Sequence, residues 1–157
     1  MPALVTSDLL AESLRRNGRV EFRVRGGSMR PLLRSGDVVM VQAARAKELT
    51  AGDVAVFYRA GKIFAHRVIR NTAAALLTKG DAFPDADSPV AQRELLGRVT
   101  GVRRGQKHMD LDAWLPRTLG RCMAIASASS ALWYAPARAG HRAIKRIWQR
   151  LLPVKPN

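Results

Sequence analysis

The sequence predicts a mostly β protein with additional α-helix: a compact antiparallel β domain followed by C-terminal helices. Three observations lead to this prediction. Short apolar runs recur between residues 20 and 104, and in the first of them apolar and polar residues alternate strictly, as in a half-buried strand. Gly-Asp pairs separate the runs, as turns do. After residue 105 the apolar residues recur with a helical period instead.

The elements follow from these patterns in chain order. Thr6 or Ser7 can cap a first helix, and Gly18 stands just past its end. Strands are expected at residues 20–25, 38–41, 54–58, 63–69, 75–78 and 95–102, and helices at 112–134 and 139–152. We therefore divide the chain into an N-terminal helix (1–19), a β domain (20–104) and a basic helical extension (105–157).

Composition excludes several classes of protein. A chain of 157 residues with 47% apolar residues can bury one core, so it is not a disordered basic tail. Its one cysteine allows no intrachain disulfide, and no Cys/His cluster suggests zinc. We therefore expect neither a metal nor a cofactor.

The net charge of +15 is uneven along the chain. Residues 1–102 carry 16 basic and 10 acidic side chains, and residues 103–157 carry 11 and 2. Nucleic acid, an anionic membrane surface or an acidic protein could bind such a basic end. The last helix favours the membrane, because Ile144, Ile147, Trp148 and Leu151 share a face opposite most of its basic residues.

Membrane-spanning and targeting segments are not expected. The N-terminus lacks the basic-then-apolar pattern of a signal peptide, and charged residues interrupt it. The longest uncharged run, residues 122–137, has 16 residues, short of the roughly 20 that cross a bilayer. We expect a cytoplasmic or peripherally membrane-associated protein.

A serine, a histidine and several carboxylates form the candidate site. Ser28 follows two glycines at a predicted strand end, which leaves its backbone open to another chain. A serine hydroxyl needs a base to become a nucleophile, and His66 in the apolar run 63–69 is a candidate. Asp81, Asp85 and Asp87 cluster in one turn, where one of them could orient the imidazole. Taken singly, each residue also has an ordinary structural explanation.

Together, these residues belong to a series of motif blocks. The blocks are GGSMRP at 26–31, GDVVMV at 36–41, GDVAVF at 52–57, HRVI at 66–69, LTKGD at 77–81 and LLGRV at 95–99. In this order they resemble the type I signal peptidase family of serine endopeptidases, and the resemblance covers the whole predicted β domain. It implies a signal-peptidase-like catalytic fold with Ser28 as the nucleophile.

The resemblance also implies a base and a carboxylate. Most bacterial members have a lysine before the arginine of the HRVI block, whereas this chain has His66, as in the archaeal and endoplasmic-reticulum branch. That branch has two essential aspartates six residues apart, which fall on Asp81 and Asp87. The spacing favours Asp87 as the carboxylate that orients His66 and Asp81 as its supporting partner, with Asp85 as an alternative to either.

The implied activity is cleavage of precursor peptides, such as signal or leader peptides, after small residues. Family members bind an extended peptide along an edge strand, and the expected substrate contacts here are Gly26, Met29 and Phe64. The N–H of Ser28 is the expected oxyanion donor. A second donor stays open, because Gly26 has no hydroxyl where bacterial relatives carry serine.

Other functions were weighed against this one. A non-catalytic basic module could bind membranes or nucleic acid, but the intact Ser28 and His66 and the lack of a recognition helix argue against it. Self-cleaving repressors share the serine fold but use a lysine base. The spare lysines, Lys62 and Lys79, are expected to face solvent and to lie in a turn. The expected partners are thus a peptide or precursor protein and, through the C-terminal basic helices, a membrane surface.

Overall fold

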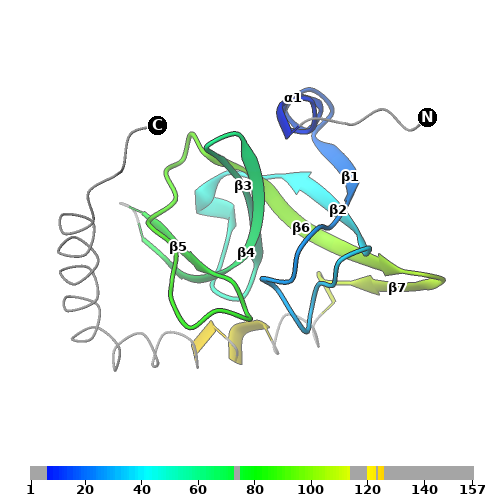
Figure 1. Ribbon diagram of the computed structural model, residues 1–157. Coiled ribbons are helices and arrows are strands. Elements are labelled where there is room, and N and C mark those ends of the chain that lie inside the picture. Colours follow the sequence, from blue (N-terminus) through cyan, green and yellow to red (C-terminus); the bar gives the residue numbers. More distant parts are fainter. Residues whose placement is uncertain (1–6, 73–74, 114–119, 123, 126–157) are drawn as a thin grey trace, which may run out of the picture.

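One antiparallel sheet dominates the computed structural model, which describes residues 7–72, 75–113, 120–122 and 124–125 (Figure 1). The elements in chain order are α1 (Ser7–Asn17), β1 (Arg19–Arg23), β2 (Val38–Ala43), the 3-10 helix η1 (Ala46–Glu48), β3 (Val54–Arg59), β4 (Lys62–Asn71), β5 (Leu76–Lys79), β6 (Leu95–Arg104) and β7 (Lys107–Asp110). The strand order is β1-β2-β6-β3-β4-β5, with β7 paired to β6. The prediction of a mostly β, antiparallel fold is confirmed.

The six expected strands are all present, and β7 is an additional one. It pairs with β6 from Gly101 to Arg104, so the sheet continues past residue 104, where we placed the end of the β domain. All four residues of β7 are exposed, and they lack the alternation that marks a half-buried strand. The strand forms as the second arm of a hairpin that turns at Gly105, whose φ is +57°.

Helix α1 belongs to the same core as the sheet. Its Ala11 and Leu14 are buried among residues of β2, β3 and β6, whereas Leu9 stays 60% exposed. Gly18 ends the helix as expected, with φ +70° and a hydrogen bond of 3.0 Å from its N–H to the carbonyl of Leu14.

Strand β3 separates two apolar clusters and thereby sets the position of the site. Val54 and Val56 belong to the first cluster, which also holds α1 and β2. Ala55 and Phe57 face the opposite side and belong to the second cluster, with residues of β4 and β5. His66 on β4 pairs with Ala55, so its side chain lies on the side of the second cluster.

Most of the predicted C-terminal extension lies outside the described residues. Residues 111–113 form a bend rather than the start of the helix expected at 112–134, while 120–122 and 124–125 are helical. Gly120 and Arg121 lie close to Gly52. A Cβ added to Gly52 would come within 2.7 Å of the backbone nitrogen of Arg121. In the described part of the chain, no helix has the length and hydropathy to cross a bilayer. The helix expected at 139–152 is not described.

Candidate active site

Two buried side chains anchor the loop that carries Ser28, which joins β1 to β2. Met29 and Leu33 are 3% and 1% exposed and pack in the first apolar cluster. The Leu33 N–H donates to the Met29 carbonyl at 2.9 Å, and the Val24 N–H donates to the Asp37 carbonyl at 2.8 Å at the base of the loop. Ser28 is therefore held by an anchor that does not involve its hydroxyl.

Both ring nitrogens of His66 have a partner. Nε2 lies 3.2 Å from the Oγ of Ser28, and Nδ1 lies 2.7 Å from Oδ2 of Asp87. A carboxylate only accepts hydrogen bonds, so Nδ1 carries the proton and the Nε2 lone pair faces the serine hydroxyl. The three side chains form a continuous chain of hydrogen bonds although they come from two loops and a strand.

Aromatic rings enclose the imidazole of His66. The rings of Phe57 and Phe64 each lie 5.9 Å from it, edge to face, and they stack on each other at 5.5 Å. This packing buries His66 and limits the ring orientations it can adopt.

The turn that follows β5 is bound directly to the backbone of Ser28. The N–H of Ala82 donates to the Ser28 carbonyl at 2.9 Å. Gly80 lies against the same serine, because a Cβ on Gly80 would come within 2.8 Å of the Ser28 carbonyl oxygen and 3.0 Å of the Phe83 ring. Only glycine allows this approach, which explains the glycine of the LTKGD block.

Thr78 is a site residue that the sequence analysis missed. It is fully buried on β5, and its hydroxyl donates to Oδ2 of Asp87 at 2.7 Å. The N–H of Asp87 donates in turn to the Thr78 carbonyl at 2.8 Å. The sequence does contain a signal that could have identified Thr78: it is a hydroxyl-bearing residue at the end of an apolar run, directly before Lys79 and Gly80.

Asp81 pairs with Arg67 rather than with His66. Arg67 donates to its two carboxylate oxygens at 2.8 and 2.6 Å, and the two side chains are only 4% and 3% exposed. The arginine also donates to the Gly52 carbonyl at 2.8 Å. Of the three candidate carboxylates, Asp87 contacts His66, Asp81 pairs with Arg67 on the same strand β4, and Asp85 is exposed on the turn.

The residues that were expected to contact substrate differ in their exposure. Met29 packs in the core, so its side chain is not a surface for substrate, and Phe64 is half-buried in the second cluster. Gly26 is open, with φ +92° and no atom within 4 Å of an added Cβ. Lys79 is buried at the end of β5 rather than solvent-exposed in a turn. The sequence analysis also missed Phe83, which is 51% exposed beside Gly80 and Ser28.

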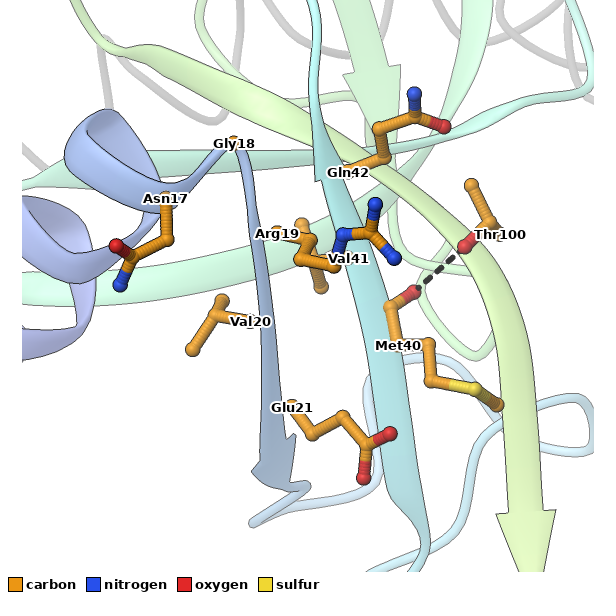
Figure 2. Close-up of a pocket in the computed structure, with 9 residues that line it drawn as sticks. All are labelled: Asn17, Gly18, Arg19, Val20, Glu21, Met40, Val41, Gln42 and Thr100. Carbon is orange, nitrogen blue, oxygen red and sulfur yellow. Dashed lines mark hydrogen bonds between the residues drawn. The ribbon is translucent and has the colours of Figure 1, made fainter.

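A surface hollow on the sheet is separate from this constellation. Figure 2 shows it along β1 and β2, bordered by Thr100 of β6, with Arg19, Glu21 and Gln42 among its lining residues. Ser28, His66 and Asp87 do not line it.

An ion pair fixes the segment that follows Asp87. Arg59 donates to both carboxylate oxygens of Glu94 at 2.7 Å, and to the carbonyls of Ser88 and Pro89 at 3.2 and 2.9 Å. Hydrogen bonds from Arg59, and then from the backbone of Ala91, lower the pKa of Glu94 from 4.5 to about 2. The pair thus links β3 to the chain between Asp87 and β6.

The lowered pKa of Glu94 predicts a pH-dependent contribution to stability. Because the folded pKa lies below the unfolded one, the contribution is complete above 4.5 and is lost as the pH falls towards about 2. We expect Glu94→Gln to lower the free energy of unfolding by about 1–2 kcal/mol at pH 7. Urea denaturation should show this difference shrinking between pH 5 and pH 2.

Glu12 provides the matched control for this measurement. It pairs with Arg16 on α1, but both side chains are largely exposed, so Glu12→Gln should change stability little at any pH. A difference between wild type and Glu94→Gln that stays constant down to pH 2 would contradict the expectation.

A comparison with known protein families identifies the family of the chain. A family model described as Peptidase S24-like matches residues 7–100, from α1 into β6, and the matched region includes Ser28, His66, Asp81 and Asp87. A search of curated proteins finds no match. The match covers more than half of the chain, which therefore belongs to the Peptidase S24-like family and has a serine peptidase-type fold.

Proposed function

We propose that this protein is a serine endopeptidase that cleaves precursor peptides, with Ser28 as nucleophile, His66 as general base and Asp87 as the orienting carboxylate. The observation that carries the proposal is the unbroken hydrogen-bond chain from Ser28 Oγ through His66 to Asp87. A serine hydroxyl is a poor nucleophile until a neighbouring base takes its proton, and the contacts of His66 with Ser28 and Asp87 support these roles.

The chemistry follows from this arrangement. His66 Nε2 takes the hydroxyl proton as Ser28 Oγ attacks the peptide carbonyl, and Asp87 stabilises the imidazolium that results. The imidazolium then protonates the leaving amine, and water releases the acyl group by the same route. Within the described chain the N–H of Ser28 makes no backbone hydrogen bond, so it is available to the oxyanion.

The substrate class rests on the resemblance and on the open space beside Gly26, where an added Cβ would meet no atom within 4 Å. Histidine at position 66 supports the archaeal and endoplasmic-reticulum branch of signal peptidases, whose members cut after small residues. Phe83 replaces Met29 as the proposed side-chain contact, because its exposed ring lies beside Gly80 and Ser28. The excess of basic residues in 103–157 supports peripheral contact with an anionic membrane, where precursors are presented.

A peptide library tests the proposal directly. Purified protein is incubated with peptides that vary residues around small side chains, and mass spectrometry identifies cut sites; we expect cleavage after small residues. The intact mass of the protein is followed in parallel, because cuts confined to its own chain would indicate self-processing instead. The absence of any cut, in the library and in the chain, from folded protein would favour the non-catalytic alternative.

A further inference from the structure

The carboxylate of Asp87 is held by a second buried side chain besides His66. The hydroxyl of Thr78, on β5, lies 2.7 Å from Oδ2 of Asp87, and the same oxygen lies 2.7 Å from Nδ1 of His66. One carboxylate oxygen therefore accepts both hydrogen bonds. The position of that oxygen relative to the imidazole depends on both donors.

The backbone fixes Thr78 relative to the strand that carries His66. Thr78 pairs with Val68 on β4, two residues beyond His66, and the Thr78 carbonyl accepts the N–H of Asp87 at 2.8 Å. Thr78 thus binds Asp87 through its main chain and its side chain. Because Thr78 is fully buried, no water can replace its hydroxyl without repacking.

We propose that Thr78 is a positioning residue of the catalytic site: its hydroxyl holds Asp87 in the orientation that keeps His66 aligned with Ser28. The proposal rests on the proposed peptidase function. A purely structural threonine would satisfy its hydroxyl on any nearby acceptor, whereas this one uses the oxygen that binds His66.

Removal of the Thr78 hydroxyl distinguishes a positioning role of this residue from a role in packing alone. Thr78→Val keeps the shape of the side chain but loses the donor, and we expect kcat to fall about 10- to 100-fold with little change in KM. Thr78→Ser, which keeps the donor, should restore most of kcat. A role in packing alone predicts the opposite order, because serine loses the methyl group that valine retains.

Thr100→Val is the matched control. Figure 2 shows the hydroxyl of Thr100, on β6, directed at the Met40 carbonyl 3.3 Å away. Thr100 lines the surface hollow, which Ser28, His66 and Asp87 do not line. The same substitution there should leave kcat and KM unchanged. Equal losses of kcat in the two valine variants would overturn the proposal.

A spectroscopic measurement keeps this test independent of peptide cleavage. The Nδ1 proton of His66, observed by NMR in the full-length protein, should change its shift or its exchange rate in Thr78→Val and not in Thr100→Val. An unchanged signal with unchanged kcat would refute the role of Thr78, whereas failure of wild type to cleave any peptide would refute the peptidase function alone. If Thr78→Val does not fold, Thr78→Cys, a weaker donor of similar size, carries the same expectations.

Discussion

Ser28→Ala should reduce peptide cleavage by at least about 10⁴-fold and leave the fold unchanged. The serine hydroxyl is the attacking group of the proposed reaction, and it lies 3.2 Å from Nε2 of His66. The loop itself does not depend on that hydroxyl. It is anchored by the buried side chains of Met29 and Leu33 and by the hydrogen bond between the Ser28 carbonyl and Ala82.

The measurement compares cleavage rates with melting temperatures. Ser35→Ala is the matched control, because Ser35 is an exposed serine in the same loop and should keep the wild-type rate. His66→Ala should lose nearly as much activity as Ser28→Ala, and the double variant should lose no more, since the two side chains act as one unit. Cleavage by Ser28→Ala at the wild-type rate would show that Ser28 is not the nucleophile and would refute the proposed mechanism.

The proposed catalytic residues could be predicted because each lies in a short motif. Ser28 follows two glycines, His66 interrupts an apolar strand, and Asp87 stands six residues after Asp81. The fold then brings these motifs together across β4 and the two adjoining loops. The preference for Asp87 over Asp81 came from the six-residue spacing that the resemblance implies, and the contact between His66 and Asp87 agrees with it.

Other features depend on packing that sequence patterns do not encode. Thr78 was missed because its contact with Asp87 depends on the pairing of β5 with β4, whose register shifts between Val68 and Arg70. Met29 was expected to contact substrate, yet the loop turns its side chain into the core. Strand β7 has no apolar alternation, and its formation depends on pairing with β6.

The buried pair of Asp81 and Arg67 predicts the largest effect on stability. We expect Asp81→Ala to lower the free energy of unfolding by about 3–5 kcal/mol, because it leaves the Arg67 guanidinium buried without its counter-charge. Urea denaturation measures the loss. Glu21→Ala, which removes an exposed partner of Arg103, should cost less than about 1 kcal/mol and serves as the control.

A double substitution distinguishes a structural from a catalytic Asp81. Replacing both members of the pair, as in Asp81→Leu with Arg67→Met, removes the unpaired charge and should recover much of the lost stability. If Asp81 only supports β4, cleavage should recover along with the fold, because the contacts of Ser28, His66 and Asp87 do not include the pair. A stable double variant without activity would instead assign Asp81 a direct part in the reaction, and Asp87 would then not be the only carboxylate that the chemistry needs.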